Sequence, residues 1–360
     1  MLVLGLIVLT IGAELLVRSA SRLAISFGIS PLIVGLTVVA FGTSAPELVV
    51  SIQSSLQGQS DVALGNVVGS NILNVLLILG LSALIIPLRV SQQLIRFDVP
   101  VMIAVSLLVF AISVDGKLGK IDGCVLVLIL LGHTVWTIRR SRKESAEAAL
   151  HNAATDETST VQTQSNVSLQ VLQLVIGLAL LVLGARWFVD SAVTLARQFG
   201  VSELVIGLTI VALGTSLPEV ATSIMAAIKG ERDIAVGNVV GSNLFNLMAV
   251  LGISGLLSPD GVTVSERALW LDIPVMVAAA IACMPILFSG HVISRSEGGI
   301  FLACYLGYTT YLIVAATNAG IERSITWTIL GIAIPLTAIT IGIGVYRTVK
   351  GIDQSEPNVG

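Results

Sequence analysis

Long apolar segments recur along the whole of this 360-residue chain, and they restrict its fold more than any other feature. Each is long enough to cross a hydrocarbon core of about 30 Å as a helix. Strands of a membrane barrel would instead alternate apolar and polar residues over about 10 positions, and no such alternation occurs. The chain is therefore predicted to be an all-α polytopic membrane protein. Its apolar segments lie at about 2–25, 31–57, 62–87, 98–114, 121–138, 169–189, 201–228, 234–257, 270–289, 299–317 and 325–346.

The composition agrees with this class and argues against several others. Hydrophobic residues make up 55% of the chain and charged residues only 11%, far from the composition of a soluble domain. No basic stripe of the kind that binds nucleic acid is present. The three cysteines lie singly within apolar segments, which argues against a disulfide framework or a zinc site: Cys124, Cys283 and Cys304. We expect the lipid bilayer as the surroundings, no cofactor and no obligate protein partner.

The chain also contains an internal duplication. Gly12–Asn74 aligns without a gap with Gly184–Asn246, at the offset of 172 residues that separates Glu47 from Glu219. Gly65–Asn71 recurs identically as Gly237–Asn243, and Asp98–Met102 is echoed by Asp272–Met276. Because each repeat holds an odd number of spans, the second enters the membrane from the opposite face. We therefore predict two inverted repeats of five transmembrane helices, at 1–140 and 169–318, plus an additional C-terminal transmembrane helix at 325–346.

A polar segment at 141–168 separates the repeats. It follows Arg139 and Arg140, includes Arg142 and Lys143, and continues as a Ser/Thr/Ala/Gln tract with too little apolar content to form a core. A basic connection of this kind belongs on the cytoplasmic side. This predicts a cytoplasmic linker, an N-terminus outside and a multi-pass protein of the plasma (inner) membrane.

Two glutamates, Glu47 and Glu219, occupy equivalent places in the middle of apolar segments. An ionisable group at the bilayer centre costs at least about 2.5 kcal/mol, so such residues are functional candidates. Pro46 and Pro218 precede them and cannot donate a backbone hydrogen bond. Each proline predicts a helix break that frees carbonyl oxygens to line a cavity, with the proline at the first position of the second half-helix.

Other oxygen-bearing side chains recur around the glutamates at a spacing of four residues, which places each pair on one helix face. The pairs are Thr43 with Glu47, Ser70 with Asn74, Thr215 with Glu219, and Ser242 with Asn246. Oxygen ligands without nitrogen or sulfur suit a hard cation such as calcium or sodium. The histidines lie elsewhere, at His133, His151 and His291. We interpret His133 as a helix-face residue rather than a proton relay.

Two structural interpretations compete with ion binding. Ser44 to Glu47 and Ser216 to Glu219 have the Ser-x-x-Glu spacing of a helix capping box. A carboxylate retained only as a cap at the bilayer centre would be costly, so ion binding is favoured. For one set of glycines the packing interpretation is the better one, because small residues at this spacing allow helices to approach closely: Gly65, Gly69, Gly237 and Gly241.

With both Gly-Thr-Ser-x-Pro-Glu motifs present, the chain resembles the calcium/cation antiporter superfamily, and within it the prokaryotic sodium/calcium exchangers, up to about residue 318. The resemblance implies a central calcium site formed by Glu47, Glu219, Thr43 and Thr215. It also implies flanking sodium positions completed by Ser44, Ser216, Ser70, Ser242, Asn74, Asn246 and the carbonyls of Ala40 and Ala212. Relatives often have Asp at the position of Asn246, and potassium-dependent ones have Asp in both repeats. The two asparagines therefore argue against potassium dependence.

The predicted function is secondary active exchange of sodium for calcium by alternating access, with the sodium gradient driving calcium export. An empty, occluded site would bury two unpaired carboxylates, so the carrier should reorient only when ions are bound. Calcium/proton antiport through the same glutamates is the alternative. Broken helices disfavour a channel. An enzyme is disfavoured because no nucleophile or metal-activated water is indicated beside the glutamates.

Overall fold

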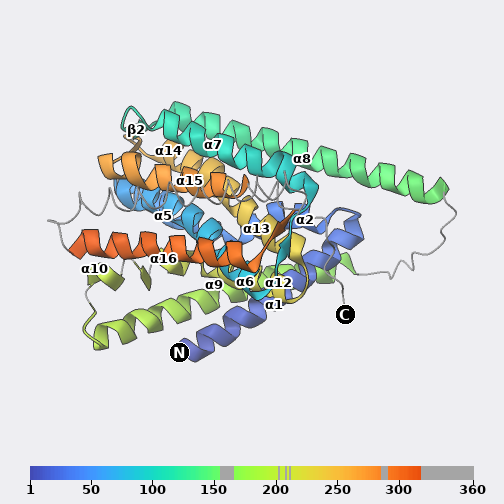
Figure 1. The fold of residues 1–360 in the computed structure, drawn as a ribbon, viewed down its shortest axis with the longest axis horizontal. Helices are drawn as coiled ribbons and strands as arrows, with labels where there is room; N and C mark the ends of the chain where they lie inside the picture. Colours follow the sequence, from blue (N-terminus) through green and yellow to red (C-terminus); the bar gives the residue numbers. More distant parts are fainter. Residues whose placement is uncertain (155–165, 202, 207–208, 211, 285–290, 318–360) are drawn as a thin grey trace.

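The fold is a bundle of apolar helices, seen in a computed structural model that describes residues 1–154, 166–201, 203–206, 209–210, 212–284 and 291–317 (Figure 1). Within these residues, seven helices are long and apolar enough to cross a membrane. An eighth span results if the bent pair Pro31–Thr43 and Ala45–Leu56 counts as one, and two shorter apolar helices lie at Leu217–Ile228 and Ala268–Ala282. The prediction of an all-α polytopic membrane protein is confirmed. The predicted segment at 325–346 lies outside the described residues.

The first repeat consists of helices interrupted by π-helical turns (η) and two short strands. In order these are α1 (Leu2–Phe27), α2 (Pro31–Val34), η1 (Gly35–Val39), α3 (Ala40–Thr43), α4 (Ala45–Leu56), α5 (Ser60–Leu73), η2 (Asn74–Leu79), α6 (Gly80–Ile85), β1 (Leu88–Arg89), η3 (Leu94–Asp98), α7 (Val99–Ile112), β2 (Lys117–Leu118) and α8 (Lys120–Ala154). The last helix continues into the polar segment predicted at 141–168.

The second repeat follows the same order. Its described elements are α9 (Val167–Gln198), α10 (Glu203–Ile206), α11 (Ala212–Thr215), α12 (Leu217–Ile228), α13 (Arg232–Phe245), η5 (Asn246–Val250), α14 (Leu251–Leu257), β3 (Val262–Thr263), η6 (Ala268–Asp272), α15 (Ile273–Ala282), β4 (Val292–Ile293) and α16 (Arg295–Thr317). The π-helical turns η2 and η5 begin at Asn74 and Asn246, which are equivalent positions in the two repeats.

The helices divide into a buried centre and a lipid-facing periphery. The span Arg232–Leu257 has 83% of its most apolar window buried, whereas Lys120–Arg140 has only 17%. In Figure 1, α13 accordingly lies inside the bundle and α8 runs along its edge. The segment that carries the second Gly-Asn-Val-Val-Gly-Ser-Asn sequence therefore lies in the centre of the bundle.

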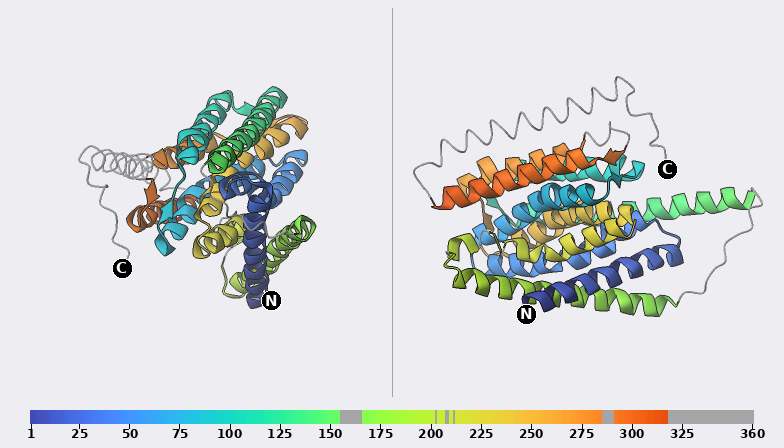
Figure 2. Two further views of the ribbon diagram at one scale, coloured as in Figure 1. Left: turned by 90° about the vertical axis from the view of Figure 1, so that its right-hand side faces the viewer. Right: turned by 60° about the horizontal axis from the view of Figure 1, so that its bottom comes forward.

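Helices α1 and α9 lie side by side through glycines that allow backbone contact (Figure 2). A Cβ atom built at Gly12 would lie 2.7 Å from the Leu181 amide nitrogen, and one at Gly177 would lie 2.8 Å from the Leu16 nitrogen. Later residues of α1 meet earlier residues of α9, so the two helices are antiparallel. Cβ atoms built at Gly237 and Gly241 would lie 2.8 Å from the Leu32 carbonyl oxygen and 2.5 Å from that of Leu36, as the packing interpretation predicted. At Gly65 and Gly69 that interpretation is wrong, because a Cβ atom there would meet nothing within 4 Å.

Contacts between the repeats occur in exchanged pairs. Leu88 of β1 lies opposite Ile293 of β4, and the equivalent strands pair Leu118 of β2 with Val262 of β3. When two residues of different repeats meet, their counterparts in the opposite repeats meet as well. Such reciprocity is the pattern of a two-fold relation. Together with the antiparallel α1 and α9, it fits the inversion predicted from the duplicated sequence.

Candidate functional site

The helix breaks lie at the two serines of the duplicated motif. Ser44 has φ −84° and ψ 7° between α3 and α4, which are bent by 46°, and Ser216 has φ −89° and ψ 5° between α11 and α12. The predicted breaks are confirmed. Pro46 and Pro218 occupy the second position of their half-helices rather than the predicted first, because Ala45 and Leu217 already have helical hydrogen bonding.

Both glutamates are completely buried, and each is held by the serine at the other repeat's break. Ser216 Oγ donates to Glu47 Oε1 over 2.8 Å, and Ser44 Oγ donates to Glu219 Oε1 over 2.8 Å. Neither serine side chain makes a capping hydrogen bond to its own helix. The capping-box interpretation is therefore wrong: these hydroxyls bind carboxylates across the repeat interface.

Ser70 and Asn74 join this group from α5 and η2. Ser70 Oγ lies 3.0 Å from Ser216 Oγ, and Asn74 Nδ2 donates to Asn243 Oδ1 over 3.0 Å. Their counterparts Ser242 and Asn246 are also fully buried. The centre of the protein thus contains polar side chains of both repeats in an otherwise aliphatic interior.

Several of these oxygens have no hydrogen-bond partner within the described residues. They are Glu47 Oε2, Glu219 Oε2, Asn74 Oδ1, Asn246 Oδ1 and Ser242 Oγ. Buried polar atoms are normally satisfied, and an oxygen left without a donor is costly. All five are of the carboxylate, amide or hydroxyl type that calcium and sodium take as ligands.

The threonines of the motif contact asparagines and also lie close to the glutamate of the opposite repeat, Thr215 beside Glu47 and Thr43 beside Glu219. Thr43 Oγ1 donates to Asn238 Oδ1 over 3.2 Å, and Thr215 Oγ1 donates to Asn66 Oδ1 over 3.3 Å. Asn66 Nδ2 in turn donates to the Glu47 carbonyl oxygen over 3.1 Å. Asn66 and Asn238 were not among the predicted site residues, although their recurrence within identical heptapeptides was a signal that could have identified them.

The Ala40 carbonyl lies at the same break. It accepts hydrogen bonds from the Ser44 amide at 3.0 Å and from Thr43 Oγ1 at 3.4 Å. Ala212 opens α11 at the equivalent point. Ion binding by these two carbonyls stays a prediction.

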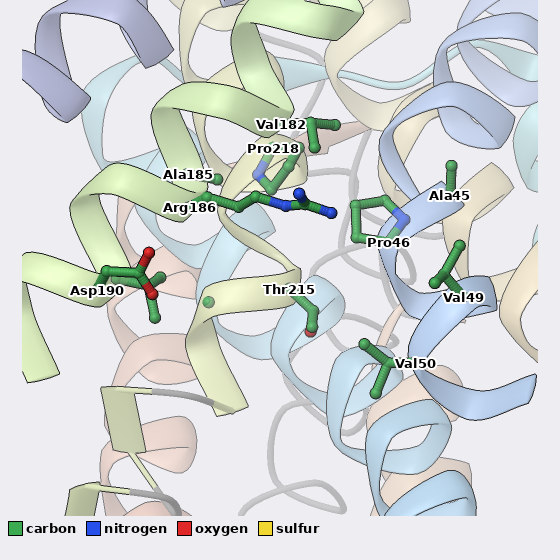
Figure 3. Close-up of a pocket in the computed structure, with 12 residues that line it drawn as sticks. Ala45, Pro46, Val49, Val50, Val182, Ala185, Arg186, Asp190, Thr215 and Pro218 are labelled. Carbon is green, nitrogen blue, oxygen red and sulfur yellow. The ribbon is translucent and has the colours of Figure 1, made fainter. Parts of the chain in front are cut away.

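A cavity of about 350 Å³ reaches the two breaks from the side of α9. Its walls include Pro46 from α4, Thr215 and Pro218 from the second break, and Arg186 and Asp190 from α9. Figure 3 shows the Arg186 side chain extending from α9 toward Pro46. The position equivalent to Arg186 in the first repeat is Glu14, which binds Lys229 over 2.8 Å. The two repeats therefore differ in charge beside the site.

Comparison with known proteins is consistent with this geometry. Residues 1–139 and 169–314 match the family model described as sodium/calcium exchanger protein. The chain belongs to the sodium/calcium exchanger protein family. Inner membrane protein YrbG of Escherichia coli (strain K12) is 40% identical to this exchanger-family chain over 259 residues, covering 72% of it and 79% of YrbG. Sodium/calcium exchanger MaX1 of Methanosarcina acetivorans is 33% identical over 343 residues, covering 86% and 97% of the two chains.

The exchanger fold is also that of a solved relative. The sodium-calcium exchanger NCX_Mj superposes with a TM-score of 0.73 at 30% identity, covering 86% of this chain and 96% of its own. The predicted resemblance to the calcium/cation antiporter superfamily is confirmed. The protein is a multi-pass cation antiporter and not an enzyme.

Proposed function

We propose that this exchanger couples sodium entry to calcium export by alternating access, through one ion site formed between the two repeats. The observation that carries the proposal is the pair of buried carboxylates, Glu47 and Glu219, each with one oxygen fixed by a serine and the other without a partner. The free Oε2 atoms are available to a cation that bridges the repeats.

The charge of this site favours calcium and sodium as alternative occupants. Two carboxylates contribute a charge of −2 if both are ionised, and one calcium ion or two sodium ions would balance it. Among the described residues, no group of three or more His, Cys, Asp and Glu side chains forms a metal site. The remaining ligands would be the neutral oxygens of Ser70, Ser242, Asn74 and Asn246, which add no charge for a potassium ion to balance.

Obligatory exchange follows from the burial of the same two groups. A site without ions would leave both carboxylates uncompensated in a low-dielectric interior, at a cost of several kcal/mol each. The occluded intermediate is therefore accessible to the ion-bound protein and not to the empty one. The direction of transport then depends on the sodium gradient.

The names of two relatives support this choice of ions, although those names describe the relatives and not this chain. MaX1 and NCX_Mj are named sodium/calcium exchangers, and YrbG is named an inner membrane protein. The name of YrbG supports a place in the inner membrane for this protein as well. We further propose that its linker lies in the cytoplasm and its N-terminus outside. The basic residues that flank the linker support that orientation.

The test is calcium uptake into liposomes that contain the purified protein and carry an imposed sodium gradient. We expect uptake that requires sodium inside, is unaffected by potassium and is lost in Glu47→Gln and Glu219→Gln. Uptake driven equally well by a pH gradient without sodium would establish calcium/proton antiport instead. Sodium-driven uptake that survives Glu47→Gln would refute the assignment of the site.

A further inference from the structure

The two repeats place a carboxylate at the same point outside the ion site but give it different partners. Asp98 ends η3 and Asp272 ends η6, at an offset of 174 residues. In the second repeat, Tyr308 Oη of α16 donates to Asp272 Oδ1 over 2.8 Å. The position equivalent to Tyr308 on α8 is His133, whose Nε2 lies 3.3 Å from Asp98 Oδ1. A tyrosine in one repeat thus corresponds to a histidine in the other.

Asp98 also lacks the second compensating group of Asp272. Arg267 Nε lies 4.0 Å from Asp272 Oδ2, whereas the position equivalent to Arg267 is Gln93. Asp98 is completely buried, and neither of its carboxylate oxygens has a hydrogen-bond partner within the described residues. His133 is therefore the group on which charge compensation of Asp98 depends.

Few other charged groups surround the pair. Arg140 lies above the Phe97 ring, with 3.8 Å from its guanidinium carbon to the ring centroid, and Phe97 also contacts Trp136. The adjacent elements α2, α7, η5 and α14 contain no Asp, Glu, His, Lys or Arg. In η3 and in α8 up to Arg140, the other charged residues are Arg96, which is exposed, Lys120, Asp122 and Arg139. Beyond Arg140, α8 continues with Arg142, Lys143, Glu144, Glu147 and His151. Arginine and lysine keep their charge near neutral pH, and histidine is the residue that changes charge there.

We propose that Asp98 and His133 form a proton-binding site that tunes the calcium affinity of the ion cage, defined as the proposed site of Glu47, Glu219, Ser70, Ser242, Asn74 and Asn246. When His133 is neutral, Asp98 is a buried carboxylate without a countercharge. One proton on the imidazole converts the two groups into a balanced ion pair at the distance already present. The proton is an effector at this site and is not exchanged, so the inference does not depend on which ion drives transport.

A continuous set of contacts leads from this pair to the cage. Asp98 is followed directly by α7, and Met102 lies one turn along that helix. Asn243 Nδ2 donates to Met102 Sδ over 3.4 Å, and Asn243 Oδ1 accepts from Asn74 Nδ2 over 3.0 Å. Asn74 is one of the proposed ion ligands. Protonation of His133 beside Asp98 can therefore alter the position of α7 and of the Asn74 amide. It also adds a positive charge that offsets the Asp98 carboxylate, which weakens the attraction for calcium.

The experiment measures calcium binding to the purified full-length protein at constant sodium, from about pH 5.5 to about pH 8, the range in which histidine changes charge. His133→Tyr gives the first repeat the partner found in the second, and Tyr308→His makes the opposite change. We expect the unmodified protein to bind calcium more weakly at low pH than at high pH. The ratio of its affinities at the two ends of the pH range should be about fivefold smaller in His133→Tyr. Tyr308→His should make it larger.

A control and a second readout separate proton binding from a packing defect. His291→Asn removes an imidazole elsewhere and suits the positive φ of 63° at that residue. It should leave the pH profile unchanged. The melting temperature gives an independent measure: its change between about pH 8 and about pH 6 should be smaller in His133→Tyr. If His133→Tyr keeps the unmodified pH profile by both measures, or if His291→Asn changes it equally, the proton site does not exist. Failure of sodium-driven flux alone would instead count against the proposed exchange reaction.

Discussion

The hydroxyl groups of Ser44 and Ser216 should make a large contribution to calcium binding, and their removal is the most direct test of the site. Each donates to a carboxylate of the opposite repeat over 2.8 Å in a fully buried position. A hydrogen bond to a charged group contributes about 1.5–3 kcal/mol. Because about 1.4 kcal/mol corresponds to a factor of ten, Ser44→Ala should weaken calcium binding by about 10-fold to 150-fold.

The reciprocal geometry sharpens this expectation. Ser216→Ala should cost at least as much as Ser44→Ala, because Ser216 Oγ also lies 3.0 Å from Ser70 Oγ. Ser254→Ala is a matched control, since Ser254 is equally buried on α14 but its hydroxyl has no hydrogen-bond partner within the described residues. That variant should bind calcium as the unmodified protein does.

Equilibrium binding of radioactive calcium to the purified protein, at constant pH and sodium, measures all three variants on one scale. The reasoning is refuted if Ser44→Ala or Ser216→Ala binds calcium within about threefold of the unmodified protein, below the smallest loss expected from a charged hydrogen bond. A loss of similar size in Ser254→Ala would show that any serine truncation disturbs the bundle.

Three further predictions concern packing, the inter-repeat network and the cavity. Gly12→Val should prevent close contact of α1 with α9, since its Cβ would lie 2.7 Å from the Leu181 nitrogen, and size-exclusion chromatography should show loss of folded protein. Asn66→Ala leaves the Thr215 hydroxyl without its acceptor and should destabilise the protein by about 1–3 kcal/mol, measured by thermal unfolding; an unchanged melting temperature would contradict this role. Arg186→Gln removes a positive charge from the cavity wall and should raise the calcium association rate in stopped-flow measurements, most clearly at low salt, whereas equal rates at all salt concentrations would exclude steering.

Much of the fold was predictable because apolar length and internal repetition are properties of the sequence alone. The breaks beside Pro46 and Pro218 followed from the missing amide donor, and the structure confirms them. The position of each proline was wrong by one residue, because helix boundaries depend on local hydrogen bonding that composition does not specify. The π-helical turns at η2 and η5 were not predicted, since their sequences have no property that distinguishes them from an α-helix.

Partners across the site were harder to predict than the residues themselves. Spacing along one helix suggested Thr43 beside Glu47, but the break at Ser44 separates them and Thr43 binds Asn238. Similarly, the Ser-x-x-Glu spacing indicated a local cap, whereas the hydroxyl of Ser44 binds the glutamate 175 residues away. Local periodicity describes neighbours on one element, and these partners come from elements that meet only after the repeats have packed together.

The exchanged serine–glutamate bonds also have a consequence for biosynthesis. Glu47 is synthesised 169 residues before Ser216, the hydroxyl that binds its side chain. During synthesis the first repeat therefore has to enter the bilayer with its carboxylate lacking that donor, and water or a proton must compensate until α12 arrives. Retention of newly inserted protein by membrane quality control should accordingly depend on completion of the second repeat, and a chain truncated before Ser216 should be recognised as unfinished however well its own helices have formed.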